Sequence, residues 1–169
     1  LVKDVSSLQM AHKVDTVVLD KTGTLTLGKP EVTDSWWKDE LSKEKYAGIL
    51  YATENLSHHP LASSICSYLS LANPSIPEVN FSLTDFAEKR GLGVQAKVND
   101  QYYFAGNESF LNEINIPFSD EVRLQIGELK KRARSVILFA DAHEVIALFG
   151  LADLLKPDTA HAISGIKEM

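Results

Sequence analysis

The hydrophobic pattern differs between the two ends of the chain and its middle. Near the start, residues 14–19 form a short β-branched run that stops at Asp20, and a continuous apolar run of this kind predicts a buried strand of a parallel sheet. Near the end, a strand leads into an apolar helical pattern over residues 157–169, with Pro157 in its first turn. Both ends therefore predict pieces of an α/β domain.

The middle of the chain predicts helices and an antiparallel sheet. Helical spacing covers residues 42–55, where Ser42 is the expected N-cap, and a second stretch that begins at Pro60 and is stopped by Asn73-Pro74. The pair Asn99-Asp100 predicts a tight turn between two strands. The expected strands are 31–37, set off by the turn-forming residues 28–30, then 81–86, 93–98, 101–105, 135–140 and 144–151, and the remaining helices are 107–114 and 119–133.

These patterns predict an α+β chain in which one domain is inserted into another. Residues 1–29 and 150–169 would belong to an incomplete α/β domain, and residues 30–149 would form an antiparallel sheet flanked by helices. A strand at 14–19 needs parallel neighbours on both sides, and the sequence offers few candidates for them. We therefore expect this strand to be disordered, docked elsewhere or paired with another chain.

Composition and charge limit the partners. The chain has 169 residues, 44% of them hydrophobic and 24% charged, which is typical of a globular protein. Its net charge of −6 argues against binding to nucleic acid or a membrane surface but allows a small anionic ligand. Cys66 is the one cysteine, so the chain forms no internal disulfide and no CxxC metal site. Since no apolar run approaches the ~20 residues of a membrane helix, we expect a soluble, intracellular chain.

Residues 20–26, with the sequence DKTGTLT, are the strongest chemical signal. A carboxylate that follows a parallel strand points into the crevice where α/β folds bind ligands, and the next backbone N–H groups can form a nest for an anion. Lys21 adds a positive charge to this loop. Asp20 can therefore attack a phosphoryl group, provided that Mg²⁺ screens the repulsion between the two anions.

This string is identical to the phosphorylation motif of the P-type ATPases, which the chain therefore resembles. The resemblance implies that Asp20 is the phosphorylated nucleophile, that Lys21 and Thr22 act beside it, and that Mg²⁺ binds at Asp20 and Thr22. Soluble phosphatases of the haloacid dehalogenase class usually carry a second Asp where this chain has Thr22, and threonine cannot replace it as a general base. A longer-lived aspartyl phosphate, which a pump requires, is the expected result.

The middle block resembles the heavy-metal-transporting (P1B) branch of that family. In residues 54–62 (ENLSHHPLA), Glu54 matches an acidic position and His59-Pro60 matches the family's His-Pro dipeptide, whereas His58 departs from the usual Glu. The resemblance implies that Glu54 and His59 recognise and orient the adenine of ATP. The departure at His58 makes the segment less negative.

Two glycine motifs extend this resemblance. Gly91-Leu92-Gly93 is similar to the family's Gly-x-Gly, and Gly106-Asn107 to its Gly-Asn pair. Glycines let the backbone approach a planar base or a phosphate closely. The resemblance implies that Gly91 and Gly93 line the wall beside the base and the α-phosphate. Asn107 would fix the glycine loop or contact the ribose-phosphate.

Residues 150–157 are similar to the hinge that returns the chain to the phosphorylation domain. Asp153 and Lys156 match its Asp-x-x-(Arg/Lys) pattern, with Asp153 at the hinge and Lys156 placed to meet the terminal phosphates of ATP. The sequence contains neither the Gly-Asp-Gly-x-Asn-Asp nor the Thr-Gly-Glu motif of these pumps. The resemblance thus implies a nucleotide-binding domain with the adjoining edges of a phosphorylation domain, taken from the cytoplasmic part of an integral membrane protein.

The implied ligands are ATP and Mg²⁺. Implied partners are the remaining domains of the pump and a transported ion held by membrane helices, with copper favoured over zinc, cadmium or cobalt, and no nucleic acid. The chain by itself is expected to bind Mg-ATP weakly and to hydrolyse hardly any. Two alternatives are a free-standing phosphatase of the haloacid dehalogenase class and a non-catalytic nucleotide-binding module.

Overall fold

The computed structural model describes residues 14–78 and 81–167. The chain divides into two compact units, a terminal unit of residues 1–28 and 155–169 and an insert unit of residues 29–154. It passes between them within two strands, β1 (Thr26–Trp37) and β6 (Val145–Leu155). The sequence places the corresponding boundaries after residues 29 and 149.

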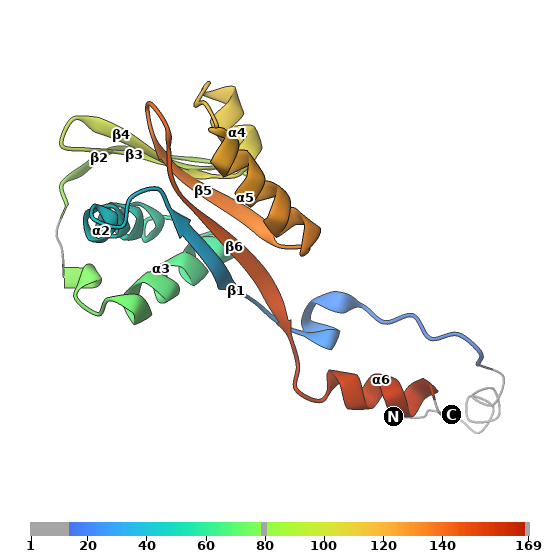
Figure 1. Ribbon diagram of the computed structural model, residues 1–169. Coiled ribbons are helices and arrows are strands. Elements are labelled where there is room, and N and C mark those ends of the chain that lie inside the picture. The colour runs from blue at the N-terminus through green and yellow to red at the C-terminus, as the bar shows by residue number, and fades with distance from the viewer. Residues whose placement is uncertain (1–13, 79–80, 168–169) are drawn as a thin grey trace. The chain divides into compact units, whose positions relative to one another are not determined.

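A six-stranded sheet organises the insert unit (Figure 1). Its strand order is β1-β6-β5-β4-β3-β2, and the paired neighbours from β2 to β6 are antiparallel. The predicted antiparallel sheet is therefore confirmed. The four strands not yet given are β2 (Leu83–Lys89), β3 (Gly93–Val98), β4 (Gln101–Gly106) and β5 (Ser135–Asp141).

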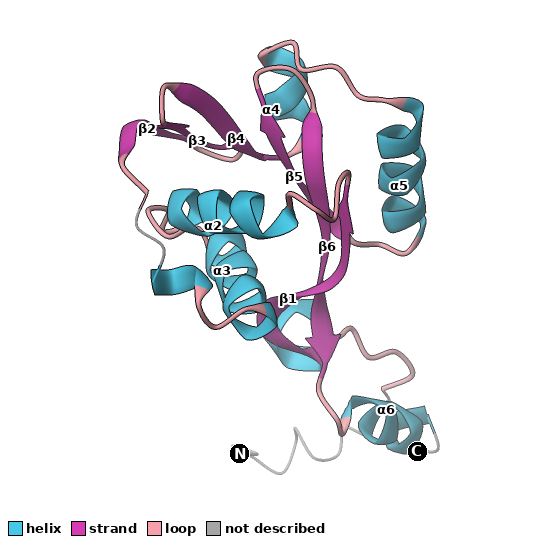
Figure 2. Ribbon diagram, turned by 60° about the vertical axis from the view of Figure 1, so that its left-hand side comes forward, coloured by secondary structure: helices cyan, strands magenta, loops and turns pink. Residues whose placement is uncertain are grey.

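Helices cover both faces of this sheet (Figure 2). α2 (Lys43–Glu54) and α3 (Pro60–Ala72) lie on one face, with the short turn Ile76–Glu78 after them, whereas α4 (Glu108–Glu113) and α5 (Asp120–Lys131) lie on the other. Side chains of the central strand β5 alternate between two cores, since Phe139 packs on the α2–α3 side and Leu138 on the α4–α5 side. Both side chains are 0% exposed, so β5 is buried on its two faces.

Local sequence signals explain several element ends. Asn99 and Asp100 both have positive φ angles, 49° and 65°, as a tight two-residue hairpin turn requires. Pro60 opens α3, and the helix ends at Ala72 before the predicted stop. Ser42 precedes α2 as expected, but its hydroxyl donates to Asp39 at 2.6 Å and makes no capping hydrogen bond.

The break predicted at residues 28–30 is wrong, because β1 runs through these residues without interruption. β1 is an edge strand, and an edge tolerates proline because one side of the strand needs no ladder hydrogen bond. Gly28 adopts a φ angle of 72° within it. At the other boundary, β6 continues to Leu155 rather than ending at residue 151.

In the terminal unit, residues 14–19 do not form the predicted buried strand, which agrees with the expectation that this run lacks parallel neighbours. Residues 14–20 have no regular structure, and Val18 is 91% exposed. All strands of the described residues belong to the antiparallel sheet, so this run has no parallel neighbour to pair with. A wide turn (Lys21–Leu25) follows, and α6 (Thr159–Lys167) closes the described part of the chain.

α6 begins two residues later than predicted, and the last two residues of the predicted helix lie outside the described ranges. Among the described residues, none of the helices combines the length and the apolar character that a bilayer crossing demands.

Candidate functional site

The loop after Asp20 is a single turn held by one buried threonine. Gly23 adopts a φ angle of 77°, which a glycine accepts without steric cost, and its N–H donates to Thr26 Oγ1 at 3.2 Å. The same hydroxyl donates to the carbonyl oxygen of Lys21 at 3.0 Å. Thr26 is only 2% exposed, whereas Asp20, Lys21 and Thr22 are exposed. The three predicted catalytic residues are thus exposed, and the hydrogen bonds of the buried Thr26 hold the turn that carries them.

The return segment is bound to this turn within the terminal unit. The backbone N–H of Lys156 donates to the carbonyl oxygen of Leu25 at 3.0 Å, and Thr159 Oγ1 donates to the same oxygen at 2.7 Å. Lys156 Nζ donates to the carbonyl oxygen of Gly23 at 2.6 Å. Within the terminal unit, the structure therefore brings Lys156 to the loop that follows Asp20. Asp153 lies near the end of β6, just before the insert unit ends at Leu154.

The loop offers oxygen ligands for a hard cation. A Mg²⁺ ion is commonly held by one or two protein carboxylates, with water and substrate phosphates completing its octahedral shell. Asp20 supplies one exposed carboxylate and Thr22 further oxygen atoms on the same turn. No group of three or more His, Cys, Asp or Glu side chains suited to a metal occurs in the described part of the chain. The residues present fit a Mg²⁺ ion that arrives with a phosphate, and not an all-protein metal cage.

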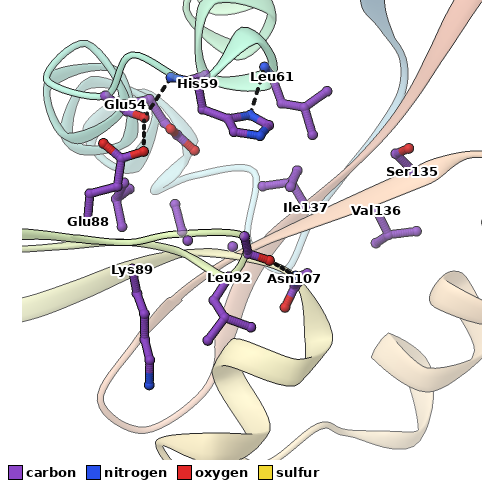
Figure 3. A pocket seen from close by; sticks show the side chains of 17 residues that line it. Glu54, His59, Leu61, Glu88, Lys89, Leu92, Asn107, Ser135, Val136 and Ile137 are labelled. Carbon is purple, nitrogen blue, oxygen red and sulfur yellow. Dashed lines mark hydrogen bonds between the residues drawn. The ribbon is translucent and has the colours of Figure 1, made fainter.

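The insert unit contains a pocket of about 320 Å³ (Figure 3). Its walls come from the end of α2, the segment before α3, the turn between β2 and β3, and the starts of α4 and β5. A volume of this size suits a small organic ligand. Five of the predicted nucleotide-binding residues line it: Glu54, His59, Gly91, Gly93 and Asn107.

His59 is fixed by the helix that follows it. Its Nδ1 accepts the backbone N–H of Leu61 at 3.2 Å and so caps α3, while its own N–H donates to Ser57 Oγ at 3.1 Å. Because Nδ1 is the acceptor, the neutral ring carries its proton on Nε2. His59 thus presents an aromatic face and an Nε2–H donor to the pocket that it lines. His58, the departure from the family pattern, is exposed and does not line the pocket.

Glu54 is the one buried carboxylate of the pocket. It is the last residue of α2 and only 6% exposed. Burial raises the pKa of Glu54 to about 7, and the nearby negative charge of Glu88 contributes. No hydrogen bond from another described residue reaches its carboxyl group. The Glu54 carboxyl group is therefore available for a hydrogen bond with a ligand in the pocket.

The glycines of the pocket serve different purposes. Gly91 has a φ angle of 74°, and a Cβ there would meet nothing within 4 Å. Gly93 pairs with Gly106 across β3 and β4, and a Cβ on Gly93 would lie 2.3 Å from the carbonyl oxygen of Ala105. Gly91 is thus required by the turn and Gly93 by the close approach of two strands, and neither position adds a side chain to the pocket wall.

Asn107 ties the glycine turn to α4. Its Oδ1 accepts the N–H of Phe110 at 3.0 Å and caps the helix, and its Nδ2 donates to the carbonyl oxygen of Gly91 at 2.9 Å. Its backbone N–H donates to the carbonyl oxygen of Leu92 at 2.9 Å. Of the two roles that the resemblance implies for Asn107, the structure displays contacts that fix the glycine loop.

Several pocket residues were missed by sequence reasoning. Ser57 and Glu88 line the pocket and face each other, with 3.4 Å between Ser57 Oγ and Glu88 Oε1. Ser57 stands inside the ENLSHHPLA segment and could have been selected there, but Glu88 belongs to a strand remote from it. Ser135, at the start of β5, also lines the pocket without any motif to mark it.

Comparisons with known proteins show which family the chain is similar to. The family model of the haloacid dehalogenase-like hydrolases matches residues 14–169. The "Probable copper-importing P-type ATPase A" of Enterococcus hirae is 32% identical over 168 residues, which cover 99% of this chain and 22% of that protein. A copper-exporting P-type ATPase of Staphylococcus saprophyticus is 32% identical over 169 residues, covering 100% of this chain and 20% of that protein.

A solved structure leads to the same family. The crystal structure of a zinc-transporting PIB-type ATPase matches with a TM-score of 0.70 and 30% identity, covering 88% of this chain and 23% of that one. The chain thus spans about a fifth of the length of the curated relatives it matches. The resemblance to heavy-metal P-type ATPases is confirmed, and the chain belongs to the haloacid dehalogenase-like hydrolase family.

Proposed function

We propose that this chain is the ATP-binding and phosphorylation segment of a heavy-metal-transporting P-type ATPase, with copper as the transported ion. The observation that carries the proposal is the pocket, because five residues between positions 54 and 107, selected for their motifs, line one cavity. The same chain carries the DKTGTLT loop on an exposed turn. The copper-transporting ATPases among its relatives support the choice of ion.

In the pocket, the base of ATP would lie between His59 and the glycine turn. His59 offers its ring for stacking and Nε2–H for a hydrogen bond, while Glu54 offers a carboxyl group without a protein partner. Gly91 and Gly93 leave the opposite wall open to a flat ligand. Asn107 holds that wall in place through the Gly91 carbonyl.

At the loop, Asp20 would act as the nucleophile. An Asp20 carboxylate oxygen attacks the γ-phosphorus, the bond from that phosphorus to the bridging oxygen of ADP breaks, and the electron pair leaves with ADP. Asp20 and Thr22 would hold Mg²⁺, which when bound neutralises charge on the phosphates. Thr22 provides no general base, so the aspartyl phosphate would persist.

For the return segment, we propose that Lys156 positions the phosphorylation loop through Gly23 and Leu25. Its predicted contact with the terminal phosphates would require the Nζ group to exchange the Gly23 carbonyl for phosphate oxygens. Asp153 would act at the hinge between two domains. We propose that residues 30–149 form the nucleotide-binding domain and that residues 1–29 and 150–169 are parts of the phosphorylation domain.

In the whole protein, this segment would form a cytoplasmic domain and work with the remaining domains of the pump and with metal-binding membrane helices. ATP hydrolysis through the aspartyl phosphate would drive cation transport. The two relatives described above are named for opposite directions, import and export. A free-standing phosphatase is disfavoured by Thr22, and a non-catalytic module leaves the complete DKTGTLT loop without a use.

The test is a titration of the chain with Mg-ATP, followed by NMR. Chemical-shift changes are expected at residues 54–59 and 91–107, and His59→Ala should weaken binding by at least about tenfold, equivalent to 1.4 kcal/mol. His143→Ala is the matched control, because His143 is an exposed histidine in the turn between β5 and β6. Equal affinities for the two variants, or shifts confined to other residues, would contradict the proposal.

A further inference from the structure

We propose that Ser57 is a positioning residue of the pocket: its hydroxyl oxygen holds the backbone N–H of His59 and so keeps the imidazole ring in the orientation that receives the base. The inference rests on the proposed function, because it takes His59 as a side chain that contacts the base. Ser57 acts through His59 and needs no contact of its own with the ligand.

His59 is an exposed side chain, so packing alone does not fix its ring. This separates it from Glu54, the other side chain proposed to face the base, which is only 6% exposed at the end of α2. An exposed ring that turns freely loses this freedom when a ligand binds, and the loss weakens binding. Hydrogen bonds that fix the ring beforehand therefore raise the affinity without touching the ligand.

Three local restraints act on His59. Pro60, the first residue of α3, confines the residue before it to extended backbone angles, and His59 has a φ of −73° and a ψ of 137°. At the ring, Nδ1 accepts the N–H of Leu61 at 3.2 Å. On the preceding side, the backbone N–H of His59 donates to Ser57 Oγ at 3.1 Å (Figure 3). This last contact orients the peptide unit that leads into His59, and with it the direction in which the side chain projects.

Ser57 is itself anchored to neighbouring elements. Its N–H donates to the carbonyl oxygen of Glu54 at 2.9 Å, which joins Ser57 to the end of α2. Its Oγ also lies 3.4 Å from Oε1 of Glu88 on β2. A hydroxyl group has one proton and two lone pairs, so donation toward this carboxylate leaves a lone pair for the His59 N–H. The distance to Glu88 exceeds that of an ordinary O–H···O hydrogen bond, so the His59 N–H is the stronger partner.

The consequence is a defined tautomer of the His59 ring. Since Nδ1 accepts from Leu61, the proton of the neutral ring stays on Nε2. Without the Ser57 hydroxyl, the peptide unit before His59 can rotate, the ring can leave Leu61, and either ring nitrogen can carry the proton. Ser57 thus sets the fraction of molecules in which the ring face and the Nε2–H group are both ready for a flat base.

The experiment compares Ser57→Ala with Ser57→Thr by titration of the chain with Mg-ATP at pH 8, where a histidine is ordinarily neutral. Ser57→Ala removes the acceptor and should weaken binding about threefold to tenfold, the effect of losing one hydrogen bond that preorganises the site. Ser57→Thr keeps Oγ and should bind within about twofold of wild type. Both variants are expected to fold, because Ser57 lies in a loop outside the two hydrophobic cores.

Ser64→Ala is the matched control. Ser64 lies on α3, and its Oγ donates to the carbonyl oxygen of Pro30 at 2.6 Å, so its replacement also removes a serine hydrogen bond that joins two elements. Its other hydrogen bond, to the carbonyl oxygen of Pro60 at 3.1 Å, leaves His59 untouched as well. Ser64 does not line the pocket. Ser64→Ala should therefore bind Mg-ATP within about twofold of wild type.

A second readout is the imidazole ring of His59 in the absence of nucleotide. The ¹⁵N chemical shifts of a neutral imidazole distinguish the Nε2–H tautomer from the Nδ1–H tautomer, and the loss of a signal in His59→Ala assigns it to His59. Wild type, Ser57→Thr and Ser64→Ala should show the Nε2–H form. Ser57→Ala should show a mixture of the two forms. A serine that only stabilised the fold would leave these shifts unchanged.

The outcomes separate this inference from the proposed function. The role of Ser57 would be overturned by a Ser57→Ala variant that binds as tightly as wild type, by equal losses in Ser57→Ala and Ser64→Ala, or by an unchanged His59 spectrum in Ser57→Ala. Each of these results leaves the nucleotide pocket standing. Failure of the wild-type chain to bind Mg-ATP would overturn the proposed function, and the nucleotide-free spectra would then still decide whether Ser57 fixes His59.

Discussion

Strand β5 and residues 14–20 have similar sequences and opposite environments. Both are short runs of apolar and β-branched residues that end in an aspartate, SVILFAD in β5 and VDTVVLD in the terminal unit. In β5, Phe139 is 0% exposed, while Val18 in the other run is 91% exposed. β5 lies between β4 and β6, whereas residues 14–20 have no strand beside them in the described parts of the chain. An apolar run becomes a buried strand only where neighbours complete its hydrogen bonds and cover its faces.

The aspartates that end these two runs, Asp141 and Asp20, also differ in burial. Asp141, at the end of β5, is buried, and its Oδ1 accepts the backbone N–H groups of His143 at 2.8 Å and Glu144 at 3.0 Å. The Asp141 carboxylate therefore stabilises the hairpin turn between β5 and β6. Asp20 is exposed on the open side of its loop. A carboxylate that is free to react and one that fixes a turn can therefore follow nearly identical strand patterns.

The largest effect is expected from replacing each of these aspartates by asparagine in the full-length pump that we propose carries this chain. Asp20→Asn should reduce the acid-stable phosphoenzyme formed from labelled ATP to background, because the nucleophile is lost. Asp141→Asn should retain phosphorylation, since its role lies in the turn. Phosphoenzyme formation by the Asp20→Asn variant would contradict the assignment of Asp20 as the nucleophile.

A smaller effect is expected from truncating the two apolar runs. Phe139→Ala should lower the free energy of unfolding by about 3–5 kcal/mol, because it leaves a cavity in a packed core. Val18→Ala should change it by less than about 0.5 kcal/mol, because the side chain is exposed. Urea denaturation monitored by tryptophan fluorescence compares the two variants. A large loss in Val18→Ala would show that residues 14–20 pack against the chain in solution.

The smallest of the three effects is the pH dependence of stability, which should differ between the buried Glu54 and the exposed Asp20. The pKa of Glu54 is raised from 4.5 to about 7 in the folded state, so its contribution to stability is complete below pH 4.5 and is lost as the pH rises through 7. The loss amounts to about 3 kcal/mol at 1.36 kcal/mol per pH unit.

Urea denaturation at pH 4.5 and pH 8 should therefore show wild type losing more stability than Glu54→Gln, whose side chain does not titrate. The exposed Asp20→Asn serves as control and should follow wild type at both pH values. Parallel pH dependences of wild type and Glu54→Gln would mean that the Glu54 carboxyl is solvated.

Much of the insert unit could be predicted from the sequence. The bounds of α3 and β3 and the turn at Asn99-Asp100 follow from short-range signals, because proline, turn residues and apolar periodicity act over a few positions. The continuation of β1 through Pro30 could not be predicted, since it depends on β1 lying at the edge of the sheet. Ser42 lost its expected cap to a competing partner, Asp39, in the same loop.

In the candidate site, too, the sequence predicted individual residues, whereas their arrangement depends on the fold. Glu54, His59, Gly91, Gly93 and Asn107 were selected as separate motifs, and only folding placed them around one cavity. Glu88 carries no motif, so its place beside Glu54 follows from the pairing of β2 with β3 and from the packing of α2. The hydrogen bond from Lys156 Nζ to the Gly23 carbonyl oxygen joins positions 133 residues apart, so no local sequence signal predicts it.

The amino-acid sequence alone determined which segments could become helices, strands and turns, and which side chains had the chemistry for phosphoryl transfer. The tertiary structure decided which apolar runs are covered, which carboxylates lose their water, and which distant side chains share a pocket. The reason is the range of the forces: backbone preferences and caps are set by residues a few positions away, whereas burial, strand pairing and the pKa of Glu54 depend on segments that only the folded chain brings together.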